Sequence, residues 1–190
     1  IHYVDTQNKL KQLIWEDDKV EVYSFPLQHR INTTGFLFKE KPLARNIDKY
    51  KLEKLNVSFS EIHKLKLGYD ATDNNGNILS NEELTIAPPP PRSFAYCSDT
   101  RFFESLANDI KDVDLLYHES TFLEDKIDRA AKTFHSTAKQ AAEMANLSNA
   151  KKLLLGHFSA RYTELNEFLI EAKPIFNNVE LAIEGTEFDV

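Results

Sequence analysis

Cysteine is nearly absent from this sequence: Cys97 is the one thiol among 190 residues. A single thiol excludes an internal disulfide and a metal site built from several thiolates, and it suits the reducing environment of the cytoplasm. Long apolar runs are absent too. No stretch reaches the roughly 20 apolar residues of a membrane-spanning helix, and the chain does not open with the charged and apolar regions of a signal peptide. We therefore expect a cytoplasmic protein with no membrane partner.

The sequence also lacks an excess of positive charge, because its formal net charge is −7. If that charge were spread evenly, it would argue against a nucleic-acid partner. It is uneven, since residues 39–66 contain eight basic and four acidic side chains and carry a local charge of +4. The basic side chains are Lys39, Lys41, Arg45, Lys49, Lys51, Lys54, Lys64 and Lys66. The charge argument against a nucleic acid therefore does not apply to this segment.

The length allows one hydrophobic core with an appendage, but not two full domains. The chain opens on Ile1 with the apolar run IHYV, which has the character of a strand inside a sheet, so we expect a piece of a longer product. Residues 39–91 differ from the rest: a charged stretch with weak helical spacing leads into a turn-rich run and then four prolines at 88–91. We expect residues 39–91 to form a flexible arm inserted into a single domain made of residues 1–38 and 92–190.

Outside the arm, apolar runs alternate with helical patterns. Residues 20–25 and 36–38 are rich in β-branched and aromatic types and predict two adjacent strands. Beyond the arm, short apolar runs at 93–97, 113–117 and 153–156 are each followed by a helical pattern, at about 103–111, 137–147 and 164–172. Thr137 and Gln140 have the spacing of a capping box, and residues 179–183 predict an edge strand. The alternation predicts an α/β fold with a largely parallel sheet covered by helices.

Titratable side chains follow the expected strand ends with regularity: His29, Asp99, His118 with Glu119, and His157. His135 stands just before the helix that Thr137 opens. Any one of them has a structural explanation, because a lone histidine at a strand end is more often hydrogen-bonded than a ligand, and a lone aspartate is more often a cap. Together they are harder to dismiss, because side chains at the carboxyl ends of parallel strands converge on one edge. Histidines with a carboxylate suit zinc, although manganese and iron accept the same ligands.

Five stretches of the sequence together resemble a known family. They are PLQHRINTTGFLFKE, YCSDTR, LLYHESTF, FHSTAKQAA and LLLGHFSARY. In this order they are similar to the C-terminal motifs of ribonuclease Z, the tRNA 3′-processing endonuclease of the metallo-β-lactamase superfamily. The resemblance extends over nearly the whole chain. It implies the C-terminal half of an αββα sandwich, two zinc ions in the complete active site of the full protein, and precursor tRNA as the substrate from which the 3′ trailer is removed.

The resemblance also implies roles for single residues. His29 would ligate one zinc ion, Asp99 would bridge both ions, and His157 would ligate the other. Glu119 and His135 would form a proton-transfer pair near the leaving oxygen, because a carboxylate bonded to imidazole raises its basicity and fixes its orientation. These assignments predict that the metal and the acid–base pair share one edge of the sheet.

Two further residues would hold the scissile phosphate. Arg161 offers a bidentate fork and Ser159 a hydroxyl group. Pairing of Arg161 with a carboxylate explains that residue equally well. The two phosphate contacts are therefore expectations from the family motif alone.

The family pattern includes a His-x-His-x-Asp-His motif in the N-terminal half, and no stretch of this sequence matches it. That motif would supply the remaining metal-site residues and an aspartate taken as the general base. Three of the expected ligands are too few for two tightly held ions. We therefore expect this chain alone not to cleave RNA.

The arm at 39–91 matches a protruding segment that grips tRNA in this family. Its basic side chains would neutralise phosphates without reading bases. The match is imperfect, because residues 56–60 read NVSFS where such arms often carry a Gly-Pro turn. A solvated charged loop is the alternative explanation of the arm, and His63 within it is expected to be a surface residue. The resemblance also implies a homodimer in which the arm of one subunit presents tRNA to its partner.

Two other functions remain open. One is a hydrolase of the same fold that acts on small phosphodiesters or esters, for which a basic arm would be unnecessary. The other is a non-catalytic tRNA-binding or dimerisation subunit without the metal-binding half. Joint retention of His29, Asp99, His135 and His157 argues against the second function, because a decayed site has no reason to keep them.

Overall fold

The computed structural model describes residues 10–190, so the strand expected in the opening residues 1–4 lies outside the described part. The chain divides into two compact units. One unit runs to Glu40 and resumes from Arg92 to Val190, and the other is Lys41–Pro91. The arm was expected to begin at residue 39, but the last strand before it continues to Glu40, which leaves Lys39 within the sheet.

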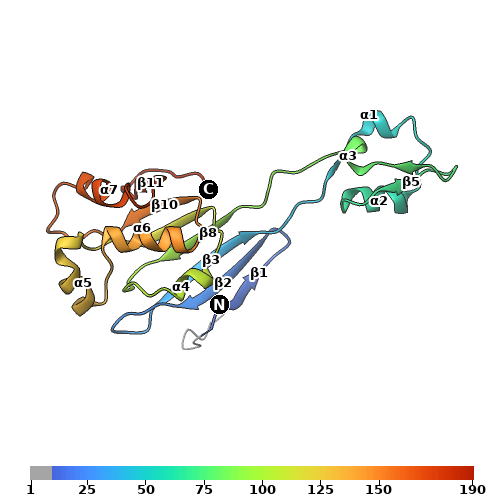
Figure 1. The fold of residues 1–190 in the computed structure, drawn as a ribbon. Coiled ribbons are helices and arrows are strands. Elements are labelled where there is room, and N and C mark those ends of the chain that lie inside the picture. Colours follow the sequence, from blue (N-terminus) through green and yellow to red (C-terminus); the bar gives the residue numbers. More distant parts are fainter. Residues whose placement is uncertain (1–9) are drawn as a thin grey trace. The chain divides into compact units, whose positions relative to one another are not determined.

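The larger unit is built on one seven-stranded sheet (Figure 1). Its strand order is β1-β2-β3-β8-β9-β10-β11. The strands are β1 Gln12–Glu16, β2 Val20–Pro26, β3 Thr34–Glu40, β8 Ser93–Cys97, β9 Leu115–Glu119, β10 Lys152–Gly156 and β11 Val179–Leu181. The first three strands and β8 pair antiparallel, whereas β8, β9, β10 and β11 pair parallel. The predicted α/β class with parallel strands beyond the arm is confirmed.

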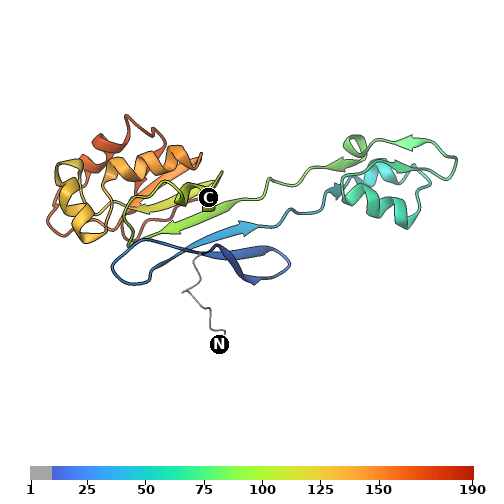
Figure 2. The ribbon, with the colours of Figure 1, turned by 60° about the horizontal axis from the view of Figure 1, so that its bottom comes forward.

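Helices pack on one face of this sheet, as Figure 1 and the turned view of Figure 2 show. They are α4 Leu106–Asp109, α6 Ala138–Leu147 and α7 Asn166–Ala172, and the segment between β9 and α6 forms η1 Glu124–Lys126 and α5 Ile127–Thr133. Their buried side chains join those of β3, β8, β9 and β10 in one hydrophobic core. The α6 helix begins with the predicted capping box: Thr137 accepts from the backbone N–H of Gln140, whose side chain accepts from the backbone N–H of Thr137. Packing in this core therefore holds the parallel strands β8, β9 and β10 in place beside the helices.

Two predicted elements differ from the observed ones in extent. The helix predicted at about 103–111 is only the four-residue α4, because residues just before it form an irregular segment whose Phe102 and Phe103 pack on the core. The strand predicted at 113–117 begins at Leu115, because the Asp114 carboxylate instead binds the backbone N–H and the hydroxyl of Ser93 at 2.7 Å. Packing and side-chain hydrogen bonds set these boundaries.

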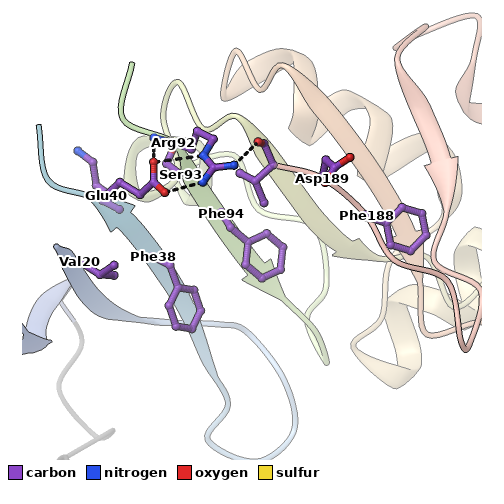
Figure 3. Close-up of a pocket in the computed structure, with 10 residues that line it drawn as sticks. Val20, Phe38, Glu40, Arg92, Ser93, Phe94, Phe188 and Asp189 are labelled. Atoms are coloured by element: carbon purple, nitrogen blue, oxygen red, sulfur yellow. Dashed lines mark hydrogen bonds and ion pairs between the residues drawn. The ribbon is translucent and has the colours of Figure 1, made fainter. Parts of the chain in front are cut away.

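The opposite face of the sheet is aromatic and partly open. Phe38 and Phe94 stack at a centroid distance of 6.0 Å, and Tyr96 and Tyr117 at 4.7 Å. A hollow of about 410 Å³ lies on this face. Figure 3 shows its lining side chains, with Phe38 and Phe94 on one side and Phe188 on the other. At its rim the Arg92 guanidinium binds both carboxylate oxygens of Glu40, at 2.8 and 3.2 Å, and this pairing holds the pKa of Glu40 below its ordinary value.

The smaller unit has a core of its own. Its elements are β4 Asn46–Ile47, α1 Lys49–Leu52, α2 Phe59–Lys66, β5 Ala71–Thr72, β6 Ile78–Leu79, α3 Asn81–Leu84 and β7 Thr85–Ile86. Leu65, Ala71 and Leu84 are buried together. The buried Asn81 side chain donates to the carbonyl oxygens of Leu65 and Tyr69, at 2.6 and 3.2 Å, so it ties α3 to the end of α2. The arm is thus a small folded unit, and its His63 is exposed.

Candidate functional site

Three neighbouring parallel strands carry the central side chains of the site. Asp99 follows β8, Glu119 ends β9, and His157 follows β10. The register places Gly156 opposite Glu119 and Cys97 opposite His118, so the three strands end side by side. His135 comes from the loop before α6. One ligand atom from each of Asp99, Glu119, His135 and His157 lies within 4.8 Å of the others.

Glu119 is the buried hydrogen-bond acceptor at the centre. One carboxylate oxygen accepts the backbone N–H of Thr100 at 2.6 Å, and the other accepts the backbone N–H of Ser136 at 3.1 Å and the Thr121 hydroxyl at 2.6 Å. The Nδ1 atom of His135 lies 2.9 and 3.1 Å from the two oxygens. Burial alone would raise the pKa of Glu119, but the hydrogen bonds from His135 and Thr121 outweigh it and the pKa is lowered. The carboxylate is therefore held ionised.

His135 is bound on one side and open on the other. Its hydrogen bond to Glu119 raises the pKa of the imidazole above its ordinary value, against the opposing effect of burial. Because Nδ1 is bound to Glu119, Nε2 is the ring nitrogen left to meet a reactant. The ring stacks on that of His157 at a centroid distance of 5.3 Å. His135 has the geometry of a proton donor oriented by a carboxylate.

His29 lies beside this group without entering it. Its ring centroid is 5.0 Å from that of His135, and its Nδ1 atom lies 3.0 Å from the carbonyl oxygen of Phe134. Phe134 caps α5 with a left-handed backbone, φ 61°, and that conformation aims its carbonyl group at His29. The hydrogen bond leaves Nε2 of His29 as the nitrogen that remains to bind a metal.

The Nε2 atom of His157 faces Asp99 Oδ1 at 3.2 Å. Two ligand atoms that bind one tetrahedral zinc ion at about 2.0–2.1 Å are separated by about 3.3 Å. The observed nitrogen and oxygen therefore fit a shared cation. Both residues adopt left-handed backbones, φ 57° for Asp99 and φ 59° for His157, a conformation that costs free energy in residues other than glycine and clusters at functional sites.

Ser159 and Arg161 lie on the loop after β10. The Arg161 Nε atom donates to the Ser159 hydroxyl at 2.9 Å, and its guanidinium group lies over the Phe122 ring at 5.0 Å. Within residues 10–190 Arg161 forms no ion pair with a carboxylate, and its contact with a phosphate stays a prediction. Both side chains are at the surface of the loop, where a phosphate oxygen can reach them.

The eight basic residues fall into different environments. Lys39 is in β3 of the sheet, Arg45 donates to the Thr85 hydroxyl at 2.6 Å, and Lys41 is half-buried. Ion pairs with arm carboxylates engage Lys51, with Asp48 at 3.7 Å, and Lys64, with Glu61 at 2.6 Å. Within residues 10–190 no such pair engages the exposed Lys49, Lys54 and Lys66. These three carry the most available positive charge of the arm.

Sequence reasoning gave no role to Thr121 or to the backbone N–H groups of Thr100 and Ser136. A signal for Thr121 was its place two residues beyond Glu119, just past the strand end. His118 was grouped with the site, but its side chain is fully buried, and burial lowers its pKa. Its Nδ1 atom lies 2.7 Å from the Glu119 carbonyl oxygen. Because side chains alternate along a strand, His118 points to the face opposite Glu119.

No family model matches the sequence. Curated proteins do match it: a ribonuclease Z from Cytophaga hutchinsonii is 48% identical over the whole chain, and one from Porphyromonas gingivalis is 45% identical over the whole chain. The chain covers 61% and 62% of these proteins. It therefore spans about three fifths of the length of the curated relatives.

Solved structures share the fold at lower identity. The short form of human tRNase Z aligns with 94% of this chain and 46% of its own, at a TM-score of 0.54 and 24% identity. The metallo-β-lactamase fold protein YhfI from Bacillus subtilis aligns with 92% of this chain and 51% of its own, at a TM-score of 0.59 and 15% identity. The chain is thus homologous over its whole length to part of the ribonuclease Z proteins, and it has the metallo-β-lactamase fold.

Proposed function

We propose that the protein to which this chain belongs is a zinc-dependent endoribonuclease that removes the 3′ trailer of precursor tRNA. The observation that carries the proposal is the convergence of Asp99, Glu119, His135 and His157 within 4.8 Å, in a chain homologous to ribonuclease Z. Zinc bound by Asp99, His157 and His29 would supply an activated water molecule and neutralise charge on the phosphodiester. Two ions in the complete site are part of the proposal.

The residues of this chain then have distinct tasks. Glu119 holds His135 in place and keeps Nδ1 protonated, so Nε2 of the imidazolium gives its proton to the leaving oxygen. Ser159 and Arg161 bind the non-bridging oxygens of the scissile phosphate, and the Phe122 ring supports the guanidinium group from below. These contacts need no movement of the core, because Glu119 ends β9 and the other side chains lie on loops at the same edge of the sheet.

The arm binds tRNA away from the reacting bond. Lys49, Lys54 and Lys66 are exposed cations on a folded unit, a feature that supports phosphate contacts independent of base sequence. In a homodimer the arm of one subunit would hold the tRNA whose 3′ end enters the site of its partner. Both the dimer and a cytoplasmic location belong to the proposal; within residues 10–190 no helix is long and apolar enough to cross a membrane.

The chain by itself is proposed to be inactive, because its candidate ligands are fewer than two ions need. The test compares the intact gene product with this chain, using precursor tRNA labelled at its 5′ end. The intact product is expected to release the trailer, to lose activity after chelation and to regain it with zinc, whereas the chain shows no cleavage. Cleavage that persists after chelation, or that survives Asp99→Ala, overturns the proposal.

A further inference from the structure

The Thr121 hydroxyl lies between two groups of the site. Its oxygen is 2.6 Å from Oε2 of Glu119 and 2.8 Å from Nδ1 of His157. Thr121 is 6% exposed and Glu119 is fully buried, so water does not compete for the bond between them, whereas the His157 side chain is 39% exposed. A single hydroxyl thus joins the carboxylate at the end of β9 to the imidazole after β10.

The direction of the hydroxyl proton follows from its neighbours. The two backbone N–H groups that bind Glu119 can only donate, and His135 donates to it as well, so this side chain acts as an acceptor. Thr121 must give its one proton to Glu119. Toward His157 the hydroxyl oxygen can then only accept, and Nδ1 of His157 must carry a hydrogen.

We propose that Thr121 is a positioning residue that fixes the neutral His157 ring as the tautomer protonated at Nδ1. The unprotonated Nε2 atom then faces Asp99 Oδ1 at 3.2 Å. The lone pairs of this nitrogen and of the carboxylate oxygen then face each other with no hydrogen between them. They repel one another when no ion lies between them, and a cation bound by both atoms removes the repulsion. The inference rests on the proposed metal site, and it assigns to Thr121 the preparation of His157 as a ligand.

Backbone contacts make the same residue a link between the two loops. The Thr121 carbonyl oxygen accepts the N–H of Ser159 at 3.1 Å, and the Ser120 N–H donates to the Gly156 carbonyl oxygen at 2.8 Å. The loops are therefore aligned by the main chain even if the hydroxyl is removed. This separation lets a hydroxyl deletion change the tautomer without displacing the loops.

Thr121→Val deletes the hydroxyl at nearly constant volume, and Thr121→Ser keeps it. Ser120→Ala is the matched control, because among residues 10–190 the Ser120 hydroxyl binds only the Gly156 carbonyl oxygen, at 3.2 Å. The intact gene product, labelled with nitrogen-15 in histidine and stripped of metal, is measured by two-bond proton–nitrogen NMR at a pH of about 8.5, at which free imidazole is uncharged. The wild type, T121S and S120A are expected to show His157 protonated at Nδ1, and T121V a shift toward Nε2 protonation.

Zinc titration of the same proteins supplies a second readout. Loss of a residue that orients a ligand weakens metal affinity by about 10- to 100-fold, so T121V is expected to lose at least about 10-fold and T121S little. Nε2 protonation in the wild type overturns the proposal without any variant. An unchanged tautomer in T121V, or failure of T121S to keep it, also overturns it. Neither the NMR measurement nor the zinc titration depends on RNA cleavage. A failure of the proposed cleavage activity would therefore be distinguished from a failure of the role proposed for Thr121.

Discussion

His135 Nδ1 and Glu119 Oε1 are 2.9 Å apart, and the glutamate is fully buried while the histidine side chain is 15% exposed. Glu119→Gln keeps the shape but removes the charge that raises the pKa of His135. Cleavage of precursor tRNA by the intact gene product is expected to fall by about 100-fold, the lower range for loss of general acid catalysis.

Single-turnover rates across pH check this prediction, with the exposed Glu164→Gln as a control for charge loss. The cleavage rate should fall at high pH, where His135 loses its proton. In the wild type this fall should come at a higher pH than in the variant, because Glu119 raises the pKa of His135 in the folded protein. Equal rates for E119Q and the wild type would refute the role of Glu119.

The arm prediction concerns affinity rather than chemistry. Replacing Lys49, Lys54 and Lys66 by alanine is expected to weaken binding of precursor tRNA and to lower the salt dependence of binding, by about 0.7–0.9 in the logarithmic slope for each phosphate that is no longer neutralised. Hydrolysis of a small phosphodiester should be unchanged. Lys173→Ala, on the sheet unit, is the control, and an unchanged salt slope in the triple variant would assign the arm no role in binding tRNA.

Gly156 sits directly before His157 and under the Tyr117 ring. A Cβ atom at this position would lie 2.3 Å from the Tyr117 hydroxyl oxygen, far inside contact distance. Gly156→Ala is therefore expected to destabilise the protein by about 1–3 kcal/mol, as overpacking does, and to shift His157. Denaturant unfolding of G156A, Y117V and the double variant checks the cause, since Y117V should relieve part of the loss. If the losses in unfolding free energy of G156A and Y117V simply add in the double variant, a clash with the Tyr117 ring is not the cause of the G156A effect.

Asp114 predicts how stability depends on pH. Burial alone would raise its pKa, but the hydrogen bonds from Lys151, at 2.5 Å, and from Ser93 prevail and lower it below the ordinary 3.8. The contribution of the ionised Asp114 carboxylate to the free energy of unfolding is therefore fully present above about pH 4, and it is lost as the pH falls through the pKa of Asp114 in the folded protein.

We expect Asp114→Asn to cost about 1–2 kcal/mol near neutral pH, and the difference from the wild type to shrink at more acidic pH. Urea unfolding at a series of pH values measures it, and Asp125→Asn, an exposed carboxylate on η1, is the control. A difference that stays constant down to about pH 2 would contradict the assignment.

Local patterns predicted much of the fold because they act over short distances. The strands at residues 93–97 and 153–156 and the capping box of Thr137 and Gln140 depend on neighbouring residues, and the structure reproduces them. The placement of Glu119 and His135 near each other came from family motifs, because no spacing rule joins residues 16 positions apart across a loop. The left-handed backbones of Asp99 and His157 were unpredictable for a physical reason: neither residue is glycine, and tertiary contacts impose the conformation.

Thr100 and Ser136 place their backbone N–H groups on the two oxygens of one carboxylate, from loops 36 residues apart. Amide hydrogens bound in this way exchange with solvent only when the buried pocket opens. The hydrogen-exchange rates of these two amides therefore report how often the pocket opens, and they can be measured without RNA or metal. Slow exchange at both positions would mean that the fold alone orders the pocket, before metal or RNA binds.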